Sequence, residues 1–154
     1  MRPLPLGAYL KTLRFGGQPL PEPQLTVPEY ASLTGVQAVI GFDGATVSGR
    51  VRPRRSGSGE EGFIEARVVL VPKPSQSGYV TAKEVEAARD GSFSFSSVVP
   101  GAYTLYALPS MSAAQLMDPA VQSALRSFAR TVDLDPRENI TVELRLAPGP
   151  EGLP

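Results

Sequence analysis

Residues 90–109, DGSFSFSSVVPGAYTLYALP, place two short strands and two turns in twenty positions, which constrains the fold more than any other segment. In the first strand Phe and Ser alternate, so that Phe93 and Phe95 point to one side and the serines to the other. Asp-Gly at 90–91 predicts a tight hairpin turn before this strand, and Pro-Gly at 100–101 predicts a corner after it. Such a unit is typical of an antiparallel sheet with one buried face.

The strand after the Pro-Gly corner has the same two-residue period. It predicts that Tyr103, Leu105 and Ala107 enter the core and that Tyr106 points outward. A buried tyrosine needs a hydrogen-bond partner for its hydroxyl, so we expect one for Tyr103.

Similar segments recur along the chain at strand spacing. Residues 83–89 contain good helix formers, but they directly precede the Asp-Gly turn and are predicted as a strand. Seven or so short strands with regular turns predict an all-β protein, an antiparallel β-sandwich. The other strands are expected over 45–53, 63–74 and 139–146, with inward side chains from Val47, Gly49, Val51, Ile140, Val142, Leu144 and Leu146.

One short helix is predicted over residues 117–130, before the last strands. Asp118 has the side chain of an N-cap, and Pro119 suits the first helical position. The apolar stripe expected to face the core consists of Val121, Leu125 and Phe128.

The first 44 residues contain a counterpart of the 90–109 unit. PLGAYLKTL at 5–13 aligns with VPGAYTLYA at 99–107, and each is followed at some distance by a period-two strand, GVQAVIGF and ITVELRL. Either the two Gly-Ala-Tyr triplets coincide by chance, or residues 1–44 are the closing strands of a preceding β-sandwich that lies mostly outside this chain. The side chains expected on one face of GVQAVIGF are Val36, Ala38, Ile40 and Phe42.

The second interpretation divides the chain into three parts. Residues 1–44 are an N-terminal extension with a proline-rich connector at 16–30, which is predicted to be extended rather than helical. Residues 45–148 are the β-sandwich, and residues 149–154 are a flexible tail. In such a fragment the first 44 residues would pack less well than the rest and leave an unpaired strand edge.

The absence of cysteine and histidine excludes several kinds of site. There can be no thiolate nucleophile, no Cys/His zinc site, no Ser-His-Asp triad and no disulfide. With 15 basic and 15 acidic residues, the chain has no net charge to attract nucleic acid or an anionic membrane. No apolar stretch of signal-peptide length precedes Lys11, and no run approaches a membrane span. Taken as a complete product, the chain would be cytoplasmic.

Five segments in this order, ATVSGRV, ARVVLVP, DGSFSFSSVVPGAYTLYALP, TVDLDP and ITVELRL, resemble the carboxypeptidase regulatory-like domain. The resemblance covers about residues 45–148 and implies a transthyretin-like, seven-stranded Greek-key β-sandwich within the carbohydrate-binding-like fold. Residues 1–44 are similar to the end of the sandwich that often precedes this domain in large bacterial exported proteins. The resemblance implies no catalytic residue, no cofactor and no metal, and an exported or cell-envelope location within a parent protein.

The carboxylates next to predicted turns do not have the spacing of a calcium loop. DLDPREN offers only Asp133, Asp135 and Glu138, with no glycine at the bend, so we expect capping and turn formation instead. Asp90 and Asp118 are assigned the same roles.

Two further motifs have structural interpretations. Asn139-Ile140-Thr141 fits a glycosylation triplet, but it also fits a turn asparagine that opens a strand, which we prefer. The basic residues at 50–55 are neutralised by Glu60 and Glu61 in the same loop, and no aromatic residues lie between them to stack bases.

Carbohydrate is the one ligand class that the implied fold suggests. Sugars bind to exposed aromatic rings, and without tryptophan the possible platforms are Tyr106, Tyr79 and Tyr30, with Tyr106 preferred. The predicted function is a non-catalytic β-sandwich module of a larger exported bacterial protein, serving as a structural spacer or protein-interaction domain. The alternatives are a carbohydrate-binding module and a small enzyme that uses only carboxylates or a Ser-Lys pair.

Overall fold

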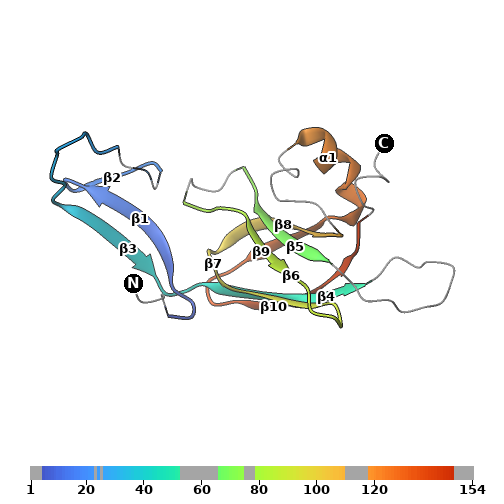
Figure 1. Ribbon diagram of the computed structural model, residues 1–154. Helices are drawn as coiled ribbons and strands as arrows, with labels where there is room; N and C mark the ends of the chain where they lie inside the picture. The colour runs from blue at the N-terminus through green and yellow to red at the C-terminus, as the bar shows by residue number, and fades with distance from the viewer. Residues whose placement is uncertain are drawn as a thin grey trace, which may run out of the picture.

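Strands dominate the computed structural model, which describes residues 5–22, 24, 26–52, 66–74, 79–109 and 118–147 (Figure 1). The elements are β1 (Tyr9–Phe15), β2 (Gln18–Pro19), β3 (Val36–Gly41), β4 (Ala45–Arg52), β5 (Arg67–Pro72), β6 (Lys83–Glu86), β7 (Ser92–Val98), β8 (Gly101–Leu108), α1 (Pro119–Ala124), the 3-10 helix η2 (Arg126–Phe128), β9 (Arg130–Leu134) and β10 (Asn139–Arg145). They form three sheets with the strand orders β2-β1-β3, β10-β4-β7 and β6-β5-β8-β9.

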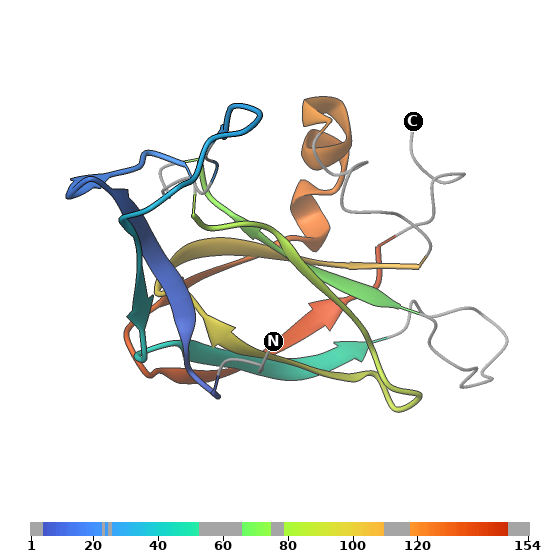
Figure 2. The same cartoon turned by 60° about the vertical axis from the view of Figure 1, so that its left-hand side comes forward.

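The second and third of these sheets stack face to face as a β-sandwich (Figure 2). Burial follows the predicted alternation, since Phe93 and Phe95 from one sheet and Tyr103, Leu105 and Ala107 from the other are at most 6% exposed. The predicted β-sandwich is therefore confirmed. The same core contains Ala45, Val47, Val51, Ala66, Val68, Leu70, Val98, Val132, Leu134, Val142 and Leu144.

One strand pair in the sandwich is parallel, which the antiparallel prediction missed. β10 runs beside β4 over seven residue pairs, from Asn139–Thr46 to Arg145–Arg52, whereas β7 is antiparallel to β4 on its other side. Parallel strands need a long crossover connection, and the chain between β4 and β10 supplies it. The predicted inward face of β10 is confirmed, because Ile140, Val142, Leu144 and Leu146 all pack in or against the core.

The Asp-Gly turn does not make the predicted hairpin between paired strands. The turn itself is tight, with Gly91 at φ 83° and its N–H donating to the carbonyl of Ala88 at 2.8 Å. The two strands then separate, because β6 pairs with β5 and β7 pairs with β4 in the opposite sheet. The Pro-Gly corner at 100–101 likewise leads from β7 to β8 in the other sheet. Both turns carry the chain across the sandwich.

The short helix covers the outer side of the four-stranded sheet (Figures 1 and 2). β5 is therefore buried on both faces, with Val68 in the sandwich core and Val69 packed with Tyr106 and Leu125 under the helix. Tyr106 lies on the face of β8 opposite Tyr103, as predicted, but it is only 6% exposed. The prediction that Tyr106 points into solvent is wrong because helix side chains cover that face.

The helix begins as predicted and ends early. Asp118 caps it by accepting a hydrogen bond from the N–H of Ala120 at 2.8 Å, and Pro119 is its first residue. α1 ends at Ala124, and one 3-10 turn follows instead of a helix up to residue 130. The predicted apolar stripe is confirmed, although it packs on the outer side of the sheet: Val121, Leu125 and Phe128.

The first 44 residues contribute a separate small sheet at one end of the sandwich (Figures 1 and 2). β1 pairs with β2 and, antiparallel, with β3. The described part of the connector 16–30 contains no helix, as predicted. β3 pairs with β1 as β9 pairs with β8, while β10 lies in the other sheet. GVQAVIGF and ITVELRL both contain the predicted strands, but the strand that pairs as β3 does is β9 rather than β10.

Tyr103 has the hydroxyl partner that its burial requires, because it donates to the carbonyl of Val99 at 2.6 Å. Burial, and to a smaller extent the nearby Tyr9, raises the pKa of Tyr103 from 10.0 to about 12. The folded pKa is the higher one, so this stabilising contribution is complete below pH 10 and is lost as the pH rises toward 12. Its loss amounts to about 2–3 kcal/mol.

We therefore expect Tyr103→Phe to lose less stability than the wild type between pH 10 and 12. The measurement is the free energy of urea unfolding at several pH values, with Tyr30→Phe, whose ring is exposed, as the control. The prediction would be contradicted if the free energy of unfolding fell equally steeply between pH 10 and 12 in Tyr103→Phe and in the wild type.

Candidate functional site

The three tyrosines predicted as sugar platforms lie in three different environments. Tyr106 is buried under the helix. The hydroxyl of Tyr79 accepts from the N–H of Leu13 at 3.2 Å and donates to the carbonyl of Leu20 at 2.7 Å, so it is tied to the N-terminal sheet. Tyr30 is fully exposed in the connector between β2 and β3. The structure does not gather the three rings on one surface.

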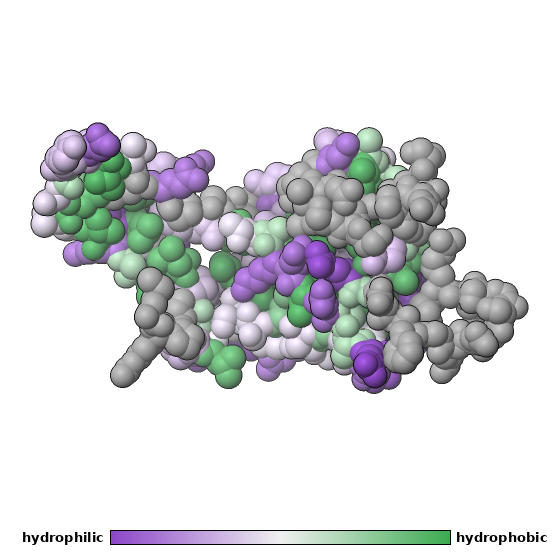
Figure 3. Space-filling model, in the orientation of Figure 1, coloured by the Kyte–Doolittle hydropathy of each residue, from purple (hydrophilic) through white to green (hydrophobic). Residues whose placement is uncertain are grey.

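Within the N-terminal sheet, the strand pair β1–β3 instead presents a side that consists of apolar residues. Directly opposed residues of an antiparallel pair share one side of the sheet. The register of β1 and β3 thereby defines what we name the apolar face, composed of Leu10, Leu13, Phe15, Val36, Ala38 and Ile40. Figure 3 shows hydrophobic side chains over this sheet, where Phe15 is 40% and Val36 44% exposed. Phe42, which follows β3, is 63% exposed.

Exposed hydrophobic residues are distributed unevenly along the chain. Within the described ranges, all large hydrophobic side chains that are exposed precede residue 43: Leu6, Phe15, Val27, Tyr30, Val36 and Phe42. The outer edge of β3 has no partner strand in the described structure. The first 44 residues are thus packed less well than the sandwich, as expected. Contiguous exposed apolar surface marks interaction sites in soluble proteins.

Hydrogen bonds hold the N-terminal sheet against the sandwich. The N–H of Gly7 donates to the hydroxyl oxygen of Ser97 at 2.8 Å, and the N–H of Gly44 donates to the carbonyl of Gly7 at 2.9 Å. Together with the Tyr79 hydroxyl, these bonds connect both ends of β1 to elements that follow residue 43. The junction between the N-terminal sheet and the sandwich is therefore held by hydrogen bonds at two separated points.

Tyr9 adds further contacts at this junction, to Gly41 and Asp43. Its ring lies across Gly41, where a side-chain methyl group would come within 2.6 Å of the ring, so glycine makes the room. Its hydroxyl donates to Asp43 at 2.7 Å. Burial and then this hydrogen bond raise the pKa of Tyr9 to about 12, and the same bond is the main cause that lowers the pKa of Asp43. Tyr9 thus links β1 to the segment that leads into β4.

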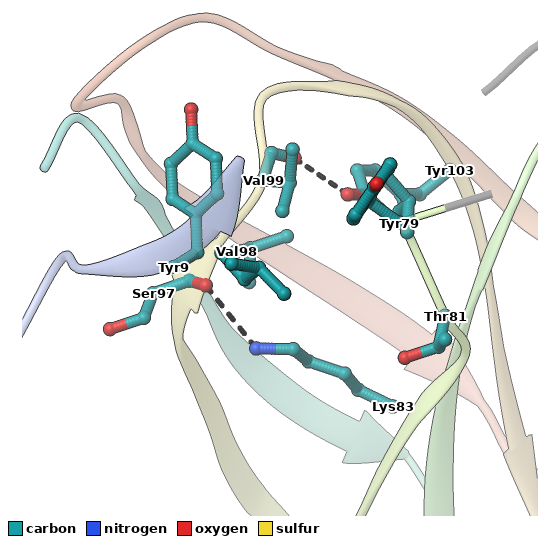
Figure 4. Close-up of a pocket in the computed structure, with 10 residues that line it drawn as sticks. Tyr9, Tyr79, Thr81, Lys83, Ser97, Val98, Val99 and Tyr103 are labelled. Atoms are coloured by element: carbon teal, nitrogen blue, oxygen red, sulfur yellow. Dashed lines mark hydrogen bonds between the residues drawn. The ribbon is translucent and has the colours of Figure 1, made fainter. Parts of the chain in front are cut away.

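A cavity of about 120 Å³ lies between the N-terminal sheet and the sandwich (Figure 4). Lys83 from β6 extends along it and donates to the carbonyls of Ser96 and Ser97, at 3.4 and 3.2 Å. Burial lowers the pKa of Lys83. The cavity is lined by Tyr9, Leu10, Tyr79, Val80, Thr81, Lys83, Ser97, Val98, Val99 and Tyr103.

A β-bulge shapes this cavity. Between the pairs Ala45–Val98 and Val47–Phe95, β7 has one residue more than β4. The bulged residue Ser97 has φ 54°, a left-handed conformation that is unusual for a non-glycine residue. The bulge turns successive carbonyls toward Lys83, while the Ser97 hydroxyl points away from the amine and toward Gly7 (Figure 4).

This geometry bears on the predicted Ser-Lys alternative. In a Ser-Lys catalytic pair the amine must reach the serine hydroxyl to take its proton. Here Lys83 contacts the carbonyl of Ser97, and the hydroxyl accepts a backbone N–H. The arrangement can hold and orient a ligand or a neighbouring strand, but it does not activate a nucleophile.

Asp90, Asp118 and the turn at Asp135 have the predicted capping or turn-forming roles, whereas Asp133 lies within strand β9. Asp90 accepts from the hydroxyl and the N–H of Ser92 at 2.6 and 3.0 Å, which lowers the pKa of Asp90. Glu138 accepts from the N–H of Asp135 at 2.7 Å, Asp133 is exposed on β9, and Asp118 caps α1. In the ranges that the structure describes, no three such side chains are grouped to hold a metal.

Two ion pairs involve the basic end of β4. Arg50 lies 3.9 Å from Asp90, and Arg52 lies 2.8 Å from Glu143, both in exposed pairs that add little stability. Residues 54–62, with Glu60 and Glu61, and the tail 149–154 lie outside the described residues. Asn139 opens β10, as predicted.

These features define a β-sandwich domain with an additional sheet at one end. Residues 42–123, which are 82 of the 154, match the family model "BOS complex subunit NOMO1-like, second beta sandwich domain". The chain therefore belongs to this family of β-sandwich domains. Its membership in the carboxypeptidase regulatory-like family stays a prediction. No curated protein is similar enough to count as a match.

Three solved structures are similar to parts of the chain. The chain shares 16% identity with a DUF3823 family protein from Parabacteroides merdae, at a TM-score of 0.37, over 65% of this chain and 45% of that one. BcpA, the major pilin subunit of Bacillus cereus, shares 13% identity with the chain at a TM-score of 0.39, over 71% of this chain and 32% of that one. GBS52, a minor pilin of Streptococcus agalactiae, shares 15% identity at a TM-score of 0.39, over 74% of this chain and 55% of that one. The chain thus spans about a third to about half of these proteins.

Proposed function

We propose that the chain is a non-catalytic structural module of a larger exported protein, and that its N-terminal sheet closes a preceding β-sandwich. The observation that carries this proposal is the apolar face, whose Phe15 and Val36 are exposed, although the described chain after residue 42 exposes no large hydrophobic side chain. Covering such a face removes apolar area from water and stabilises the assembly. The occupant we propose is a second sheet, upstream in the same polypeptide.

The sandwich within the chain supplies the template for this arrangement. β8 and β9 form an antiparallel pair whose inner side is covered by the sheet β10-β4-β7. β1 and β3 form the same kind of pair, and both β1 and β8 begin within a Gly-Ala-Tyr triplet. The matched family is described as a second β-sandwich domain, and its match starts at residue 42, after β3. A sandwich that ends with β3 fits both observations.

The hydrogen-bonded junction suits a spacer. Because β1 is fastened through Gly7 at one end and through Leu13 near the other, the proposed upstream sandwich would keep a fixed angle to this one. The absence of a membrane-spanning helix from the part of the chain that the structure describes is a separate finding.

The test compares Val36→Ser with Gln37→Ser in two chain lengths. Val36 lies on the apolar face, and Gln37 is its exposed neighbour on the opposite side. In the 154-residue chain we expect both changes to cost less than about 0.5 kcal/mol, because both positions are exposed. In a chain extended upstream by one sandwich length of natural sequence, Val36→Ser is expected to cost about 1–3 kcal/mol and Gln37→Ser still little. Urea unfolding provides the free energies.

Equal costs of Val36→Ser in both chains contradict the proposed closing role of the N-terminal sheet. A stop codon close upstream of residue 1, in frame, does so as well. Concentration-dependent self-association of the 154-residue chain that Val36→Ser abolishes, together with unchanged costs, indicates a second copy as the occupant.

A further inference from the structure

The cavity at the junction contains a positive charge without a described counter-charge. Among the described residues no ion pair includes Lys83, and its ammonium donates only to the carbonyls of Ser96 and Ser97. An ammonium has three N–H donors, so one is left for another acceptor. Keeping a half-buried charge unpaired is unfavourable, and an anion in the cavity would relieve this cost.

The remaining lining of the cavity is suited to a molecule with two different ends. The lining also includes the hydroxyl of Thr81, which lies beside the start of the Lys83 side chain (Figure 4), and apolar surface from Val80, Val98 and tyrosine rings. The hydroxyl of Tyr103 already donates to Val99. A volume of about 120 Å³ is somewhat smaller than cavities known to hold benzene, on the order of 150 Å³.

We propose that this cavity binds a small carboxylate that has a compact apolar group of about three carbons. The carboxylate accepts a hydrogen bond from the ammonium of Lys83, and the apolar group packs against Val80 and Val98. The bulge at Ser97 supports the site, because its carbonyl fixes the position of the Lys83 amine. Local strain of this kind is concentrated at functional sites in proteins.

Titration of the 154-residue protein with isobutyrate tests the site, followed by ¹H–¹⁵N correlation spectra. We expect saturable shifts at the amides of Thr81, Ser97 and Val98, with a Kd on the order of millimolar. Isobutyramide has the same shape without the charge and is expected to bind at least about tenfold more weakly, because it loses the charged hydrogen bond. Sodium chloride at matching concentration controls for ionic strength.

Lys83→Met keeps the length of the side chain and removes its charge. We expect it to weaken isobutyrate binding at least about tenfold, while Lys73→Met, at an exposed lysine outside the cavity, leaves binding unchanged. Equal binding of isobutyrate and isobutyramide, unchanged binding by Lys83→Met, or shifts located elsewhere overturns the proposal. If Lys83→Met does not fold, the comparison of the two ligands on the wild type decides.

Discussion

Gly49→Ala is expected to lower the free energy of unfolding by about 3 kcal/mol or more. A methyl group on Gly49 would overlap the carbonyl oxygen of Val142 and lie 2.9 Å from Cζ of Phe93. The carbonyl belongs to β10, which pairs in parallel with β4 at this position, and backbone cannot move aside as a flexible side chain can. The alanine variant must therefore separate β4 from β10 or displace Phe93 in the core.

The measurement for Gly49→Ala is urea unfolding followed by circular dichroism, with Ser94→Ala as the control. Ser94 lies on the neighbouring strand β7 with its side chain exposed, so its replacement should change stability by less than about 0.5 kcal/mol. A loss below about 1 kcal/mol in Gly49→Ala would show that β4 and β10 are not packed as closely as described.

Leu125→Ala is expected to cost about 2–5 kcal/mol. Leu125 is completely buried at the C-terminal end of α1 and packs on Val69 and Tyr106. Its truncation leaves a cavity between the helix and the outer side of the sheet. Because few other side chains hold this short helix, we also expect the Tyr106 ring to become accessible to solvent.

Two readouts separate these effects of Leu125→Ala. Urea unfolding gives the stability, and chemical modification of tyrosine, mapped by mass spectrometry, gives the accessibility of Tyr106. Ser127→Ala, at an exposed position of η2, is the matched control and should leave both unchanged. A Tyr106 that is modified equally fast in the wild type and in Leu125→Ala would contradict its burial under the helix.

Side-chain alternation predicted the sandwich because it reports directly which side of a strand is buried. Phe93 and Phe95 on β7 and the row starting at Tyr103 on β8 are placed as the two-residue period requires. The same alternation also indicates where β7 is bulged. After Phe95 the next buried residue of β7 is Val98, three positions on, and this break in the period marks the bulge at Ser97.

The outer layer could have been found by combining two segments. Val69 and Tyr106 make the outward side of β5 and β8 apolar, and the stripe through Leu125 gives the helix an apolar side of matching character. Each pattern needs a partner, and the period of one strand alone cannot show that the partner is a distant helix. For the same reason the prediction for Tyr106 failed while that for Tyr103 was correct.

The cavity and the strand directions were beyond the reach of local patterns. Lys83 and Ser97 are 14 positions apart, and only the assembled sheets bring the amine to the bulged carbonyls. The Asp-Gly turn at 90–91 predicts tight reversal correctly, but whether the two strands then pair or enter different sheets depends on which neighbours bury more apolar surface.

The parallel pairing of β4 with β10 determines how the sandwich responds to tension. A pull that draws Ala45 in one direction and Arg145 in the other slides these two strands past each other, so all seven opposed residue pairs are loaded at once. Adjacent antiparallel strands pulled apart from one end would instead open one bond after another. We therefore expect the sandwich to resist a pulling force most strongly through the pairing of its first strand, β4, with its last strand, β10.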